Sequence, residues 1–274
     1  MSRELMRMLL IATTALYYIS FILFFINSKW LRRIRKKADI QKESRPLTIA
    51  AAVTWIAGAL INGSIVIYNW VSNGYVPFVG TFQVLIFLSM CFPFVFFYVS
   101  YMYKGKWMAS HMVLTAAICM TGVLAMGVRS AGLLPPALQS IWFIPHILTY
   151  MISYSLFAVS FVIIVARYLS PKEDHSRMDR GTYSLICAAF PFATMGMFFG
   201  AIWANEIWGA FWSWDGKENW SLVTWVLHAL YLHFYRVKPL RKYANFLVIV
   251  GFIALIITMF FVNFFYPQSL HVYS

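Results

Sequence analysis

The stretch from Trp203 to Trp220, WANEIWGAFWSWDGKENW, gathers the side chains best suited to hold a flat apolar ligand. Five of the chain's eleven tryptophans lie within its 18 residues, beside four charged side chains. Indole rings are amphipathic and settle at headgroup depth, so we expect the stretch at a membrane surface. An aromatic belt is the alternative interpretation, but belts spread their tryptophans over many helices, and the density here favours a ligand platform. If the stretch is helical, Trp208 and Trp212 share one face.

Asp215 and Glu218 form a capping-box pattern near the end of this stretch. The first carboxylate can accept hydrogen bonds from the amides that open a helix, and the second can reach back to the preceding backbone. Gly216 follows the aspartate as a turn signal. The pattern predicts that a helix begins directly after Asp215, and it explains these two acidic residues without a ligand.

The stretch resembles the tryptophan-rich WWD signature of the haem-handling proteins of cytochrome c maturation. The longer pattern WAN-x-x-WG-x-x-WSWD-x-KE-x-W-x-L-x-x-W, followed by YLH, is most similar to the CcsA/ResC branch. The similarity extends from Pro136 to Tyr273. The branch usually has proline where this chain has Gly216, and it usually has an Asn and a Glu where this chain has Gly80 and Gln83.

The resemblance implies that three histidines bind haem iron. His146, after GLLPPALQSIWFIP, and His271, in the terminal SLHVYS, match segments that carry the branch's external haem-ligating histidines, and His233 matches the YLH histidine of a second haem position within the membrane. Low-spin haem iron takes two axial ligands on opposite faces, which imidazoles from separate segments can supply. Either external histidine could by itself be an interfacial polar residue, but their shared side with the tryptophans favours ligation. The tryptophans would cover the edge of the ring. Besides the histidines, the expected haem-binding residues are Trp203, Trp208, Trp212, Trp214, Asp215 and Trp220.

The other charged residues and the other histidines are not expected to bind the haem iron. Arg129 and Lys217 can pair with the propionates of haem, whereas Asp215 is expected to cap and orient a helix. His228 lies five residues before His233 and points about 140° away from it, so the two are not expected to share one iron. Three histidines have no counterpart in the branch: His111, His175 and His228.

The composition places the chain in a membrane. Of its 274 residues, 61% are hydrophobic and 11% charged, and the mean hydropathy is +0.71, far from the range of soluble globular proteins. The three cysteines, Cys91, Cys119 and Cys187, lie inside apolar runs, so we expect neither a disulfide framework nor a redox pair.

Eight apolar runs, most near the ~20 residues needed to cross a bilayer, predict an all-α integral membrane protein with eight transmembrane helices. We expect a single polytopic domain over residues 1–274, with the external tryptophan segment 203–220 between the sixth and seventh helices. The runs lie at 8–27, 47–69, 80–103, 108–128, 147–166, 182–203, 219–235 and 243–265.

The basic residues predict the orientation. Alternating the eight spans puts 18 of the 22 Lys and Arg residues into the segments 28–46, 104–107, 167–181 and 236–242. By the positive-inside rule these segments are cytoplasmic, so both termini and the tryptophan segment lie outside. The net charge of +13 is thereby explained by topology, which removes the case for a nucleic-acid partner.

The resemblance further implies a subunit of a system II cytochrome c synthase, which transports haem b and presents it outside to an apocytochrome c with a Cys-x-x-Cys-His motif. Thiols of that substrate would add across the haem vinyl groups, so no catalytic nucleophile is expected from this chain. A CcsB/ResB-like membrane protein is the expected partner. The expected location is a bacterial inner or plasma membrane, or a thylakoid membrane.

Two alternatives remain at this point. A membrane electron-transfer protein of the b type would hold permanent haem between histidines on facing helices, whereas here His146 and His271 are expected outside the bilayer. A CcmC-like haem handler usually has six spans, and the eight runs and the SWDGKE wording favour the CcsA/ResC branch.

Overall fold

The structure of the protein, a computed structural model, describes residues 2–28, 44–103, 106–129, 134–169 and 172–266. Every regular element in these ranges is helical, as predicted, and none of them contains a β-strand. The chain divides into two compact units, Met1–Gly132 and Leu133–Ser274. The expectation of one polytopic domain stays a prediction.

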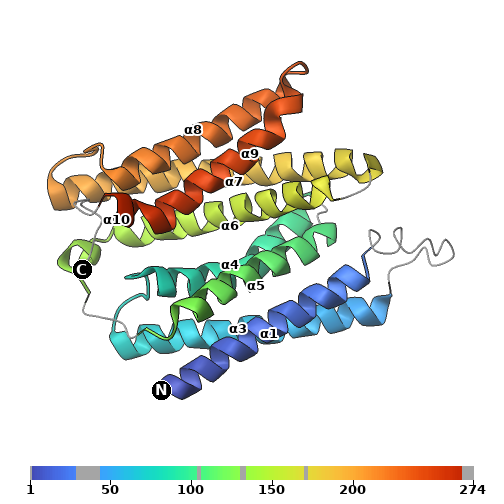
Figure 1. Cartoon of the computed structure of the whole chain (residues 1–274). Helices are drawn as coiled ribbons and strands as arrows, with labels where there is room; N and C mark the ends of the chain where they lie inside the picture. Colours follow the sequence, from blue (N-terminus) through green and yellow to red (C-terminus); the bar gives the residue numbers. More distant parts are fainter. Residues whose placement is uncertain (1, 29–43, 104–105, 130–133, 170–171, 267–274) are drawn as a thin grey trace. The chain divides into compact units, whose positions relative to one another are not determined.

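The first unit contains four long helices. α1 (Arg3–Ile26) packs against α3 (Arg45–Asn73) and α5 (Ala109–Met126), while α4 (Thr81–Tyr103) packs against α5 and α3 (Figure 1). A short 3-10 turn, η1 (Lys106–Met108), precedes α5. One buried polar pair lies inside this unit, where the amide of Asn62 donates to the Ser89 hydroxyl at 2.6 Å. The Gln83 side chain, in the first turn of α4, accepts from the N–H of Val79 just before the helix at 3.0 Å.

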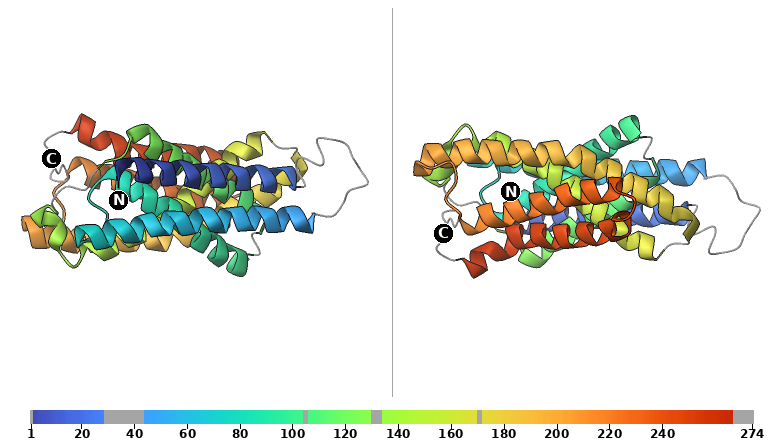
Figure 2. Two further views of the ribbon diagram at one scale, coloured as in Figure 1. Left: turned by 90° about the horizontal axis from the view of Figure 1, so that it is seen from below. Right: turned by 90° about the horizontal axis from the view of Figure 1, so that it is seen from above.

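The second unit begins with a short 3-10 turn, η2 (Pro136–Gln139), followed by α6 (Phe143–Tyr168) and α7 (Lys172–Trp208). α8 (Gly216–Arg236) begins within the tryptophan segment, and it is followed by α9 (Arg241–Ile256), a π-helical turn η3 (Ile257–Phe261) and α10 (Val262–Phe265). α6 packs along α7 and also contacts α9, and α8 packs along α9 and also contacts α7 (Figure 2).

Each of the eight predicted spans falls on one of these helices, the last on the run from α9 to α10. Seven of the helices are long and apolar enough to cross a membrane, so the chain is a multi-pass membrane protein. α8 is long enough but more polar, because its first turn contains Lys217, Glu218 and Asn219, and it also carries two histidines and Arg236. Its crossing of the membrane stays a prediction.

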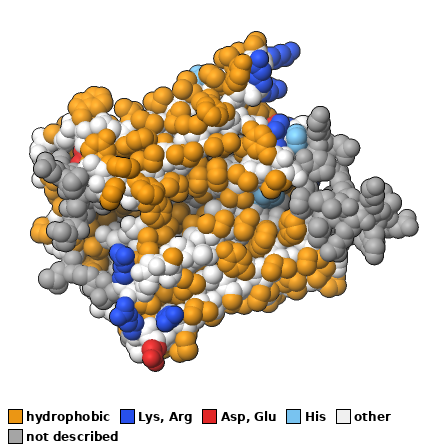
Figure 3. Space-filling model, viewed as in Figure 1, with side chains coloured by type: hydrophobic (Ala, Val, Ile, Leu, Met, Phe, Trp, Pro, Cys, Tyr) orange, Lys and Arg blue, Asp and Glu red, His pale blue; other side chains and the backbone are white. Residues whose placement is uncertain are grey.

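α7 is much longer than the run that predicted it. Its 37 residues correspond to about 55 Å of helix, well beyond the ~30 Å hydrocarbon core of a bilayer. On the face shown in Figure 3, apolar side chains cover the flanks of the helices, while lysines and arginines gather near helix ends. α7 can therefore carry the first part of the tryptophan segment away from the hydrocarbon region.

Candidate functional site

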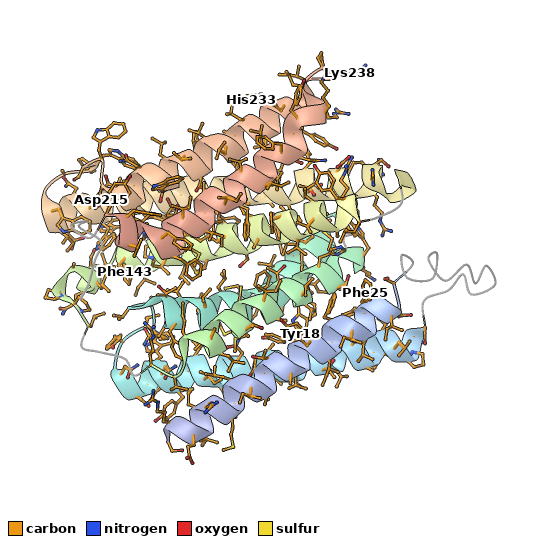
Figure 4. All side chains as sticks on the ribbon, in the orientation of Figure 1. Tyr18, Phe25, Phe143, Asp215, His233 and Lys238 are labelled. Atoms are coloured by element: carbon orange, nitrogen blue, oxygen red, sulfur yellow. The ribbon has the colours of Figure 1, made fainter. Side chains whose placement is uncertain are left out.

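The predicted external site lies at one end of the second unit, where α6 begins, α7 ends and α8 begins. Figure 4 shows Phe143 and Asp215 at this end, and His233 and Lys238 toward the other end of α8. The last turn, α10, returns to the same end and contacts α8. Segments that are far apart in the sequence are thus brought together around the tryptophans.

His146 lies in the first turn of α6, is partly exposed and packs against two aromatic rings. Its ring centre is 5.5 Å from that of Trp203 and 5.0 Å from that of Tyr150, which stands perpendicular to it. The Nδ1 atom lies 2.9 Å from the backbone carbonyl oxygen of Gly196 on α7. A carbonyl oxygen only accepts, so Nδ1 carries the proton and a neutral His146 ring has its lone pair on Nε2. Metal-binding histidines use this arrangement.

Trp203 is a buried structural residue, with 2% of its surface exposed. Its indole N–H donates to the Ala137 carbonyl oxygen at 2.8 Å, and its ring lies 5.4 Å from Phe143 and 5.0 Å from Trp208. The Trp203 ring therefore packs against both His146, the predicted iron-binding histidine, and Trp208 of the tryptophan segment. Because it is buried, the Trp203 ring packs on the side of His146 that faces the protein interior.

Two polar residues, Ser140 and Glu206, hold the segment that leads into α6 against α7. The Ser140 hydroxyl donates to the Glu206 carboxylate at 2.7 Å and accepts from the Trp142 N–H at 3.1 Å. Trp142 in turn stacks on Phe199 of α7, with ring centres 6.0 Å apart. Sequence reasoning missed both Ser140 and Glu206, because their 66-residue separation gives no local signal.

The tryptophan segment is not one helix. α7 ends at Trp208, and Gly209, with φ of 75°, adopts the left-handed conformation typical of a helix end. Trp208 and Trp212 therefore do not share a helical face. The rings of Trp212 and Trp214 meet edge to face at 5.9 Å, and the buried indole nitrogen of Trp212 has no hydrogen-bond partner among the described residues.

Trp214 has an unusual backbone and an exposed side chain. It is the one non-glycine residue with positive φ (56°) among those that the structure describes, and 68% of its surface is exposed. A bulky residue in the left-handed region is strained and needs support from its surroundings. Such strain concentrates at functional sites, and the expected role of Trp214 in haem binding stays a prediction.

The support comes from the first turn of α8. The Glu218 carboxylate accepts from the N–H groups of Ser213 at 2.8 Å and Asp215 at 3.2 Å, on either side of Trp214. Asn219 donates to the Trp214 carbonyl oxygen at 2.8 Å. Asp215 accepts from the Lys217 N–H at 2.7 Å, so the predicted capping box is confirmed. We call Glu218 and Asn219 the Trp214 clamp.

Lys217 lies beside this cap, at the start of α8. Burial lowers the pKa of its ammonium group below the usual 10.5, and the negative charge of Asp215 opposes that shift. A cation in such a setting is stabilised by anionic partners, as the expected role toward propionates requires. The other expected cation, Arg129, belongs to the first unit, and its role stays a prediction.

The chain returns to the tryptophan segment at its last described residue. A Cβ atom added to Gly216 would lie 2.8 Å from the ring of Tyr266, so no side chain fits here without displacing that ring. Glycine at this position, where the resembling branch usually has proline, leaves room for the Tyr266 ring. His271 follows five residues later and lies outside the described residues.

The two histidines of α8 have different surroundings. His233 is exposed near the end of the helix (Figure 4). His228 is fully buried, with its ring stacked 3.6 Å from Phe157 and its Nδ1 2.8 Å from the Thr224 carbonyl oxygen. It packs in the core of the second unit. Trp220, the remaining predicted site residue, is partly exposed in the first turns of α8.

Comparison with known proteins places this site in a family. The model of the cytochrome c assembly protein family matches residues 78–271. The cytochrome c biogenesis protein CcsA of Trieres chinensis is 28% identical over 278 residues, which cover 85% of this chain and 83% of that protein. The CcsA protein of Chlamydomonas reinhardtii is 32% identical over 185 residues, covering 62% and 52%. That of Trachelium caeruleum is 30% identical over 243 residues, covering 71% and 76%.

The matched residues include the Trp-rich segment, the capping box of α8 and the start of α6 with His146. They span well over half of the chain. The protein therefore belongs to the cytochrome c assembly protein family.

Proposed function

We propose that this protein is the CcsA-type subunit of a system II cytochrome c synthase, and that it presents haem b at the outer end of its second unit. The observation that carries the proposal is the state of His146, whose Nδ1 donates to the Gly196 carbonyl oxygen at 2.9 Å while its ring packs on Trp203. That geometry leaves the lone pair on Nε2, the atom that would bind iron. His271 is the proposed ligand on the opposite face.

Haem is the cargo of this reaction, and it supplies the vinyl groups to which the thiols of an apocytochrome c add. The residues of this chain hold and orient it. Trp203 keeps His146 in place from the buried side, while Trp208, Trp212 and Trp220 cover the ring and Trp214 forms the exposed margin that an apocytochrome approaches. No side chain of this protein forms a covalent bond in the proposal.

Charged residues at the start of α8 orient the haem in this proposal. Lys217 is the proposed partner of a haem propionate, and Asp215 holds the first turn of α8 from which Lys217 projects. An ammonium ion paired with a carboxylate in a partly buried site forms a strong, charge-assisted hydrogen bond. The capping box thus serves both the exposed tryptophan and the cation.

His233 is proposed to hold haem before it reaches the outer site. It lies thirteen residues after Trp220, about 20 Å along α8, so the two positions are separated by most of a bilayer. Arg236, one turn further on, is held by a hydrogen bond from its Nε to the Tyr183 hydroxyl at 2.8 Å. Its two terminal nitrogens are thereby available to a propionate beside His233.

The tryptophan segment and both termini face the outer side, and a CcsB/ResB-like membrane protein is the partner. The b-type electron-transfer alternative receives no support from α8, because His228 stacks on Phe157 rather than facing another imidazole.

The test is the haem spectrum of the protein purified with its partner, recorded for His146→Ala, His271→Ala and His233→Ala. We expect the first two to lose the external haem and keep the inner one. The third should lose the inner haem and also lower the amount of external haem, because haem reaches the outer site through that position. His111→Ala, in the first unit, is the matched control and should leave the spectrum unchanged. An unaltered spectrum in all three test variants would remove the site assignment.

A further inference from the structure

Two glycines of α7, Gly196 and Gly200, lie one helical turn apart and face the start of α6. A Cβ atom on Gly200 would lie 2.6 Å from Nδ1 and 2.7 Å from Cε1 of His146. A Cβ atom on Gly196 would lie 3.0 Å from the ring of Tyr150. The side chains of α6 therefore occupy the space that side chains at these two positions of α7 would need.

The missing side chain at position 200 is what lets the imidazole reach the backbone. Residues i and i+4 of a helix lie on the same face, so a methyl group on Gly200 would stand beside the carbonyl group of Gly196. His146 enters that space and makes its 2.9 Å hydrogen bond with the Gly196 carbonyl oxygen. Small residues four apart allow such close approach of helices within membranes.

The ring is held on its other sides as well. Tyr150, itself packed against Gly196, stands perpendicular to the imidazole at 5.0 Å, and Trp203 lies against it at 5.5 Å. Rotation of the His146 ring would break the Nδ1 hydrogen bond and disturb its packing against these two aromatic rings. The surroundings therefore determine both the tautomer of the imidazole and the direction of Nε2.

We propose that Gly196 and Gly200 form a glycine seat that positions His146, fixes its proton on Nδ1 and makes Nε2 the iron-binding nitrogen. The inference rests on the proposed function, because it assigns these glycines a role toward the external haem. Gly196 acts through its carbonyl oxygen and Gly200 through its lack of a side chain. Both are positioning residues.

The seat also influences the iron. Donation from Nδ1 to a carbonyl oxygen increases the basicity of a ligating imidazole, which favours the oxidised iron. Loss of the bond should therefore make the midpoint potential of the external haem more positive. It should also weaken haem binding about 10- to 100-fold, the usual effect of removing a partner that orients a metal ligand.

The first experiment uses Gly200→Ala in the complete complex with the partner protein. We expect less external haem, an altered spectrum and a more positive midpoint potential. Gly251→Ala is the matched control, because its Cβ would lie 2.8 Å from His228, a buried histidine outside the site. Gly63→Ala is the benign control, with its Cβ 3.7 Å from Met90. Both controls should keep the potential of the unmodified protein.

A second experiment leaves the glycines intact. In His146→Gly, added imidazole can occupy the vacated space and donate to the Gly196 carbonyl oxygen, whereas 1-methylimidazole binds iron but has no N–H to donate. We expect imidazole to restore the original spectrum and potential, and 1-methylimidazole to give a more positive potential. Equal potentials with the two molecules would overturn the seat, even if Gly200→Ala failed to fold.

The outcomes separate the two proposals. If His146→Ala loses the external haem but Gly200→Ala keeps both spectrum and potential, the glycine seat is wrong and the proposed function stands. If His146→Ala itself leaves the external haem unchanged, the proposed function fails, whatever the glycine variants do.

Discussion

The ring of Tyr266 lies against the backbone of Gly216, with its Cδ2 atom 2.8 Å from where a Cβ atom of that residue would be. This contact joins the last described residue of the chain to the first residue of α8, within the tryptophan segment. His271 follows Tyr266 by five positions, and a chain of that length reaches at most about 17 Å. The contact thus sets the starting point from which His271 can approach the external site.

Replacing Gly216 with alanine should disturb this approach. The new methyl group must displace the Tyr266 ring, so we expect weaker binding of the external haem with no effect on the inner one. The measurement is haem content and spectrum of the purified complex. Gly80→Ala is the control, since its Cβ would meet no atom within 4 Å. Gly216→Ala with Tyr266→Ala should recover part of the loss, and full haem binding in the single variant would contradict the account.

Two tryptophans of the same segment should respond to substitution in opposite ways. Trp203→Ala removes a buried ring and should destabilise the protein by about 3–5 kcal/mol. Trp214→Gly removes an exposed ring and relieves the left-handed strain, so stability should be unchanged or raised by about 1 kcal/mol. Cytochrome c maturation should nevertheless fall in Trp214→Gly. Thermal unfolding in detergent and a reporter cytochrome together measure both effects, and equal destabilisation would argue against separate roles.

The Trp214 clamp gives a further prediction. Glu218→Ala leaves the N–H groups of Ser213 and Asp215 without their acceptor, which should destabilise the protein by roughly 1–3 kcal/mol. Glu218→Gln keeps one accepting oxygen and should lie between this variant and the unmodified protein. Fluorescence of Trp214, in a background lacking other exposed tryptophans, would report its release from the Trp214 clamp. An unchanged emission in Glu218→Ala would show that Glu218 does not hold Trp214.

The lowered pKa of Lys217 predicts that the stability of the protein depends on pH. Burial lowers its pKa in the folded protein below 10.5, so near that pH the unfolded chain binds more protons than the folded one. Its contribution to the free energy of unfolding therefore rises with pH as the group loses its proton and stops rising above 10.5. Lys217→Met should raise stability at pH 7 and remove this rise, while weakening haem binding.

Thermal unfolding of the haem-free protein at pH 7 and pH 10 measures that effect. Lys238→Met, at an exposed position in the turn before α9, is the control. If Lys217→Met is less stable than the unmodified protein at pH 7, the buried ammonium is held by partners strong enough to outweigh its desolvation, and the predicted sign is wrong.

Much of the helical architecture could be predicted from the sequence because long apolar runs report membrane-spanning length directly. The capping box was also predictable, since Asp215 and Glu218 are three residues apart and act locally. The end of α7 at Trp208 could have been found from Gly209, the next residue, which adopts the left-handed conformation that glycine favours.

Contacts between distant segments could not be predicted in this way. Gly200 meets His146 across 54 positions, and Gly216 meets Tyr266 across 50, so neither pair leaves a periodic pattern in the sequence. The positive φ of Trp214 is likewise imposed by Glu218 and Asn219 against the preference of a bulky residue. The burial of His228 depends on the stacking of Phe157 and the small size of Gly251, which belong to other helices.

The central claim is that Nε2 of His146 and the imidazole of His271 bind one haem iron from opposite faces. The most direct measurement is the spectrum and midpoint potential of the external haem in His146→Met and His271→Met, each purified with the partner protein. The account predicts that either substitution gives mixed histidine–methionine ligation with a more positive potential. A spectrum and potential equal to those of the unmodified protein in either variant would contradict it.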